Sequence, residues 1–141
     1  MYKKILIPVD VSVTDDTQNL LNAAKTLTEA WDCEVHVATV IPDVGMAIVG
    51  TYMSESLEAE NRKAALDQLD AAIAQSGLKA QRQVLNGTVY DSVIEAASEL
   101  GADLIIIGAH QPKLRDYLLG ANAAKVVRHS KQSVLVVRSA S

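Results

Sequence analysis

The chain has 141 residues, of which 49% are hydrophobic and 21% charged, and its net charge at pH 7 is −4. This length fits a single domain, 1–141, and the composition lies far from that of disordered proteins. The acidic balance and the 4% aromatic content offer no surface typical of nucleic-acid binding. The apolar start is stopped by Pro8 and is too short for a signal peptide or a membrane span, so we expect a cytoplasmic protein without membrane association.

Five apolar runs predict β-strands, and they are Lys4–Val9, Glu34–Ile41, Lys79–Leu85, Asp103–Gly108 and Ser133–Arg138. The first, fourth and fifth runs contain continuous apolar stretches, which are typical of parallel strands covered on both faces. The second and third runs include polar residues, among them His36 and Gln81, so we expect these two strands nearer an edge of the sheet.

Helical patterns fill the spaces between the runs. The first has its apolar face at Leu20, Ala24, Leu27 and Trp31, with Thr14 or Asp15 as the expected cap and with Asp15 and Asp16 in its first turn. The second helix is expected from about Ser54 to Ser76 and is closed by Gly77.

The third helix opens on a capping box of Thr88 and Asp91 and ends at Gly101, and the fourth runs into His129. Strands and helices therefore alternate strictly along the chain. This alternation predicts an α/β fold with a doubly wound, five-stranded parallel sheet and helices on both faces. Periodicity alone leaves the strand order open.

In such a sheet, ligands bind beyond the carboxyl ends of the strands. The segment from Gly108 to Asn122 leaves the most hydrophobic strand with one glycine and reaches a helix start with another, Gly120. Backbone N–H groups at glycines and at a helix N-terminus bind phosphates, and Lys113 and Arg115 add positive charge. The alternative is that Gly108 only turns the chain and Gly120 only starts a helix.

Asp10 follows the first strand directly. Its carboxylate can accept hydrogen bonds from ligand amino or hydroxyl groups, hold a metal ion, or cap the turn into the first helix. Of the three histidines, His110 has the best position to contact a ligand, because it lies in the candidate segment. The chain has no Walker A sequence, no G-x-G-x-x-G, no metal-ligand spacing and no catalytic serine motif. We therefore expect no enzyme activity beyond slow ATP hydrolysis.

Several stretches together resemble one family over the whole chain. They are Tyr2 to Asp10, Gly87, Gly101 to His110, Leu118 to Ala123 and Ser133 to Arg138. In these the chain is similar to the universal stress protein family, which implies the strand order 3-2-1-4-5. The ATP-binding branch of that family carries G-2x-G-9x-G-[ST]. Here Gln111 stands at the second glycine, eight residues separate it from Gly120, and Ala121 replaces the Ser or Thr. The chain looks more like the short-loop bacterial subgroup.

The resemblance implies a stress-response regulator or sensor that binds ATP or AMP, with Mg²⁺ as a companion of the phosphates. Asp10 and Val40 would flank the adenine, with Pro8 and Val9 shaping that wall. Gly108 would approach the ribose, and the phosphate side would be formed by His110, Gln111, Gly120, Ala121 and Asn122. It also implies a homodimer, with the apolar edge Val134, Leu135, Val136 and Val137 as the expected interface.

Two alternatives remain beside this reading. The first is an adaptor that acts through protein–protein contacts alone and whose nucleotide site has degenerated, as Gln111, the shortened loop and Ala121 suggest. The second is a receiver domain. It is disfavoured because Asn86 and Gly87 stand where a phosphoacceptor aspartate would follow the third strand, and Arg138 and Ser139 where a lysine would follow the fifth.

Overall fold

The structure is a computed structural model that describes residues 2–41, 51–109 and 121–138, and for residues 51–56 it describes the backbone alone. In this part of the chain five strands alternate with four helices. The elements are β1 (Lys4–Pro8), α1 (Thr14–Trp31), β2 (Glu34–Ile41), α2 (Thr51–Ser76), β3 (Gln81–Asn86), α3 (Val89–Leu100), β4 (Leu104–Gly108), α4 (Ala121–His129) and β5 (Ser133–Val137).

The strands form one parallel sheet in the order β3-β2-β1-β4-β5. Strand β1 lies at the centre, with Ile7 opposite Val37 of β2 and Ile5 opposite Leu104 of β4. Both the α/β class and the 3-2-1-4-5 order expected from the sequence are confirmed. All strands run in one direction, so their carboxyl ends meet at the same edge of the sheet.

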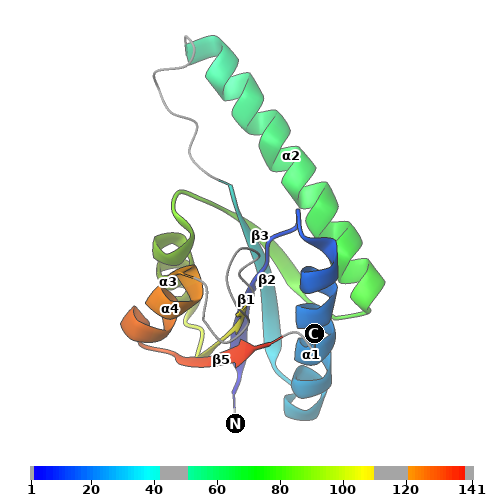
Figure 1. Ribbon diagram of the computed structural model, residues 1–141. Helices are drawn as coiled ribbons and strands as arrows, with labels where there is room; N and C mark the ends of the chain where they lie inside the picture. The colour runs from blue at the N-terminus through cyan, green and yellow to red at the C-terminus, as the bar shows by residue number, and fades with distance from the viewer. Residues whose placement is uncertain (1, 42–50, 110–120, 139–141) are drawn as a thin grey trace.

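Two apolar layers cover the two faces of the sheet. Ile5, Ile7 and Val37 pack with Leu21 of α1 and Leu69 of α2. On the other face, apolar residues of β1 and β4 pack with α3 and α4, as Leu6, Ile105, Val93 and Val126 do. Figure 1 shows α1 and α2 on one side of the sheet and α3 and α4 on the other. Neighbouring residues of β1 and β4 therefore point into different cores, which explains their continuous apolar runs.

The edges of the sheet are β3 and β5. The polar third run does form an edge, but β2 has a strand on either side, and its residues Val35 to Thr39 are buried. Strand β5 is continuously apolar, yet Val134 to Val137 are only half-buried. An apolar run shows that a strand is hydrophobic, but it does not tell whether the strand lies in the centre of the sheet or at an edge.

The helix ends agree with the sequence in part. Gly77 and Gly101 have φ values of 73° and 70°, the left-handed conformation that closes a helix. The expected cap of α1 is wrong, because Val13 is the N-cap and no side chain bonds the free amides there. The chain has already turned at Asp10 to Val13, so Thr14 and Asp15 fall inside the first turn of the helix. There the negative charges of Asp15 and Asp16 interact favourably with the helix dipole.

The start of α3 keeps the expected residues with different hydrogen bonds. Thr88 is the N-cap, and its hydroxyl donates to Asp91 Oδ2 at 2.8 Å. Neither side chain bonds a backbone amide at this cap. The capping-box sequence thus produces a side-chain pair at the helix start.

Candidate functional site

The exits of the three central strands converge at the carboxyl edge of the sheet. Strand β1 lies between β2 and β4, so residues 9 and 10 emerge between the ends of these two neighbours. The N–H of Val9 donates to the carbonyl of Ala38 at 2.8 Å, and the N–H of Ala109 donates to the carbonyl of Val137 at 3.0 Å. Strand-like pairing therefore continues past the last residue of β1 and of β4 and fixes both exits.

The apolar residues expected to form one wall lie on two faces of the sheet. Val9 is 9% exposed and packs in the core that includes Leu20 of α1. Val40 is half-buried and packs at the margin of the core formed with α3 and α4. Pro8 is buried at the end of β1. Of these residues Val40 retains the most exposed apolar surface near the edge.

Asp10 presents an exposed carboxylate at the exit of β1. Its Oδ1 accepts hydrogen bonds from the backbone N–H of Ser12 at 3.0 Å and from the Ser12 hydroxyl at 2.5 Å. Its carbonyl oxygen accepts from the N–H of Val13 at 3.0 Å and from the Thr17 hydroxyl at 2.7 Å. Within the described residues, no hydrogen bond or ion pair reaches Oδ2, so this oxygen can accept a further donor.

Gly108 ends β4 and is half-buried. Unlike Gly77, Gly87 and Gly101, it does not have a positive φ. A Cβ built on it would lie 3.9 Å from Leu20 Cδ2, an ordinary van der Waals contact. Neither the backbone nor the described neighbours therefore require a glycine here.

Ala121 and Asn122 begin α4, and both are exposed. The first amides of a helix have no intrahelical partner, and the first turn of α4 contains no acidic residue that would compete for them. His110, Gln111 and Gly120 lie outside the described residues. The structure therefore brings Asp10, Val40 and Gly108 to one edge of the sheet, while the loop that leads to α4 is not described.

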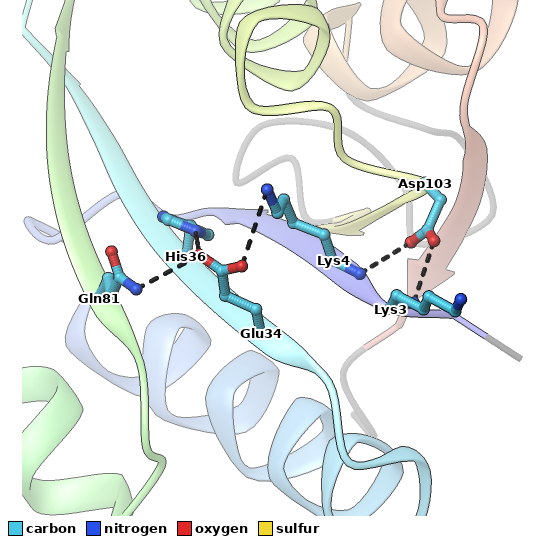
Figure 2. Close-up of polar contacts among 6 residues, drawn as sticks. All are labelled: Lys3, Lys4, Glu34, His36, Gln81 and Asp103. Carbon is cyan, nitrogen blue, oxygen red and sulfur yellow. Dashed lines mark hydrogen bonds and ion pairs between the residues drawn. The ribbon is translucent and has the colours of Figure 1, made fainter.

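A second polar cluster, which the sequence did not suggest, lies at the opposite, amino end of the sheet (Figure 2). His36 is 7% exposed, and its Nε2 lies 2.8 Å from Glu34 Oε1, where the ring N–H donates to the carboxylate. Glu34 also contacts Lys4 Nζ at 3.7 Å and accepts from the side-chain amide of Gln81 at 3.3 Å. The hydrogen bond from His36, together with the charge of Lys4, lowers the pKa of Glu34. These contacts tie β1, β2 and β3 together.

Asp103 joins β4 to β1 at the same end. Its two carboxylate oxygens accept from the backbone N–H groups of Lys3 at 3.0 Å and Lys4 at 3.1 Å (Figure 2). Burial alone would raise the pKa of Asp103, but these N–H groups stabilise the ionised form and hold the pKa below its ordinary value. The carboxylates at the amino end thus have protein partners. Most of these partners come from neighbouring strands, so the sequence does not reveal them until the pairing of the strands is known.

The described side chains form no metal-ligand cluster, and the thiol of Cys33 is not activated. In residues 2–41, 51–109 and 121–138, no three His, Cys, Asp or Glu side chains are gathered to hold a metal ion. Burial raises the pKa of the Cys33 thiol, which favours the unreactive protonated form. No described helix combines the length and apolar character needed to cross a membrane.

Comparison with known proteins gives a consistent result. The model of the universal stress protein family matches residues 1–138. Universal stress protein G from Shigella flexneri is 32% identical over 143 residues, which cover 98% of this chain and 100% of that protein. The solved structure of the hypothetical protein MJ0577 has a TM-score of 0.83 at 26% identity and covers 100% of this chain and 99% of that one.

Two further solved structures share the fold at lower identity. A universal stress protein in complex with cAMP has a TM-score of 0.72 at 22% identity and covers 99% of both chains. The universal stress protein from Archaeoglobus fulgidus in complex with dAMP has a TM-score of 0.70 at 20% identity, covering 96% of this chain and 97% of that one. From its family model, its relatives and its sheet order together, the chain belongs to the universal stress protein family.

Proposed function

We propose that this protein is a cytoplasmic, single-domain regulator or sensor of the stress response that binds ATP or AMP at the carboxyl edge of its sheet. The observation that carries the proposal is the juxtaposition of Asp10 and Gly108 at the exits of adjacent strands. Asp10 has one carboxylate oxygen without a described partner, and Gly108 is a glycine that its own backbone does not require. A hydrogen-bond acceptor beside a position without a side chain suits a ligand that lies against the strand ends.

In this proposal the ligand extends from β2 across β1 to α4. Asp10 accepts a hydrogen bond from the adenine amino group, and the half-buried Val40 contacts the ring. Gly108 lies beside the ribose, and the free amides at Ala121 and Asn122 bind phosphate, the Asn122 side chain serving in place of the missing hydroxyl. His110, Gln111 and Gly120 keep the phosphate-side role expected from the sequence. Mg²⁺ would be held mainly by phosphate oxygens and water, because proteins commonly supply only one or two carboxylates to a Mg²⁺ ion that is bound to phosphates.

The family comparisons support the adenine part of this proposal. The two ligands found in the related structures, cAMP and dAMP, each join an adenine to a single phosphate. Both belong to proteins that share the sheet on which Asp10 and Gly108 lie. A ligand with one adenine and at least one phosphate is therefore the first class to test.

The test is a nucleotide titration of the purified full chain, followed by isothermal calorimetry and by thermal unfolding. A ligand at 100 times its dissociation constant stabilises the folded protein by about 2.7 kcal/mol. We expect AMP and ATP at millimolar concentration to raise the unfolding temperature. If neither nucleotide gives heat of binding or a thermal shift, the proposed function is wrong and the adaptor without a nucleotide is favoured.

We also propose that the chain forms a homodimer through the free edge of β5. Val134 to Val137 are apolar and half-buried, and β4 occupies one side of the strand. The carbonyl of Val137 accepts from the N–H of Ala109, so the backbone N–H and C=O groups of Val137 face β4. These groups alternate along a strand, so those of Val136 face the free edge. A second copy of β5 would pair with these groups and cover the apolar side chains.

A further inference from the structure

The Asp10 carboxylate is fixed by one residue. Both the backbone N–H and the hydroxyl of Ser12 donate to Oδ1, at 3.0 and 2.5 Å. Two donors occupy the two lone pairs of that oxygen. Ser12 is the only described residue that hydrogen-bonds this carboxylate, and it leaves Oδ2 available as an acceptor.

The main chain of Asp10 is held independently of Ser12. The neighbouring Val9 amide bonds Ala38, and the Asp10 carbonyl accepts from Val13 and from the Thr17 hydroxyl. Thr17 is 4% exposed, so its hydroxyl is fixed within the packed start of α1. The Cα position of Asp10 therefore does not depend on the Ser12 hydroxyl, whereas one of the two hydrogen bonds that orient its carboxylate does.

We propose that Ser12 is a positioning residue for nucleobase recognition, which rests on the proposed binding of an adenine nucleotide at Asp10. With Oδ1 occupied, the carboxylate meets the base with a single acceptor at a fixed angle. An exocyclic amino group donates to that oxygen. A 6-oxo group, as in inosine or guanosine nucleotides, places a second acceptor against it and is repelled. The carboxylate itself prefers 6-amino over 6-oxo purines because it has only acceptors, and Ser12 strengthens this preference by fixing the acceptor in place.

The substitution Ser12→Ala isolates this role. It removes the shorter of the two hydrogen bonds to Oδ1 and keeps the one from the backbone N–H, so the carboxylate is held less firmly while the turn is retained. The side chain is exposed, and we expect the variant to fold as the parent protein does. We expect its affinity for AMP to fall about tenfold, the scale of one hydrogen bond to a charged group, while its affinity for IMP stays the same or rises. The AMP-to-IMP preference therefore falls at least about tenfold.

The experiment measures dissociation constants for AMP and IMP by calorimetry on the full chain. It compares the parent protein with Ser12→Ala, with Ser12→Thr, and with Ser98→Ala, an exposed serine on α3 far along the chain from the site. The threonine hydroxyl should restore the preference, and Ser98→Ala should keep it. The unfolding temperature without ligand should be the same in all four proteins, which separates positioning from a structural role.

The outcomes separate the two proposals. If the parent protein binds AMP and Ser12→Ala keeps the same AMP-to-IMP ratio, the positioning role is wrong and the proposed function stands. A variant that loses AMP and IMP binding equally, or that Ser12→Thr fails to rescue, also overturns the positioning role. If the parent protein binds neither nucleotide, the proposed function fails, and the role of Ser12 fails with it.

Discussion

Replacing Gly108 by alanine should make the fold more stable and nucleotide binding weaker. The backbone of Gly108 does not lie in the left-handed region, so alanine can adopt it without strain. The new methyl group would lie 3.9 Å from Leu20 Cδ2, which is a normal packing distance. The described part of the folded protein therefore accepts the substitution, and we expect its cost to fall on a ligand that approaches the end of β4.

The two effects have opposite signs and separate magnitudes. Alanine restricts the unfolded chain more than glycine does, which raises the free energy of unfolding by about 0.4–1 kcal/mol. A methyl group added where a ligand packs closely costs about 1–3 kcal/mol, the usual penalty of overpacking. The affinity for AMP should then fall by about fivefold to a hundredfold. Urea unfolding without nucleotide measures the first effect, and calorimetry with AMP measures the second.

Gly101 provides a matched control at the end of α3. A Cβ there would have no atom within 4 Å, but its φ is 70°, so alanine has space and suffers backbone strain. Gly101→Ala should lower the free energy of unfolding by about 1–2 kcal/mol and leave the affinity for AMP unchanged. If Gly108→Ala binds AMP as tightly as the parent protein, or if it unfolds more easily, the reasoning about this strand exit is wrong.

Three further predictions concern single residues. Asp10→Asn should lower the affinity for AMP about tenfold in calorimetry, because an uncharged amide is a weaker acceptor, while Asp67→Asn, exposed on α2, leaves it unchanged. Because the pKa of Asp103 is lowered in the folded protein, its stabilising contribution is present above the unfolded pKa, near 3.8, and is lost as the pH falls through the lower folded value. Asp103→Asn should therefore lose less stability than the parent protein between pH 5 and about pH 2 in urea unfolding, and an equal loss would contradict the role of its N–H partners. Val136→Pro removes an amide that faces the free edge of β5 and should give a monomer in light scattering, whereas a dimer that persists would exclude pairing at this edge.

The sequence predicts the elements of this fold well because local patterns report them. The apolar runs at Leu104 and Ile5 mark buried strands, and Gly101 marks a helix end, since each signal depends only on neighbouring residues. The position of β5 is not local in this sense. Its run looks like that of β4, and its half-exposed state follows from its place as the last strand of the sheet.

The candidate site was predictable to the same extent. The alternation of strands and helices places Asp10 and Gly108 at strand exits, and the order 3-2-1-4-5 implied by the family resemblance makes these two strands neighbours. The contacts of Ser12 with Asp10 were missed, although an aspartate side chain commonly bonds the backbone two residues on and Asp10 was visible at the start of a turn. The contact between Glu34 and Lys4 could not have been found in this way, because it requires the register of β1 against β2.

The two ends of the sheet differ in how their charges are satisfied, and this difference has a physical meaning. At the amino end, both oxygens of Asp103 accept hydrogen bonds from backbone N–H groups, and Glu34 has three described partners. In their ionised form these two carboxylates therefore stabilise the folded protein. At the carboxyl end, the donors that the described residues offer to Asp10 reach one oxygen alone. The turn itself needs only one of the two oxygens, because an aspartate side chain commonly bonds the backbone N–H two residues on. The described residues therefore leave one oxygen of Asp10 open to a donor from a ligand, as the proposed nucleotide site requires, and substitutions at the two ends should affect stability and binding separately.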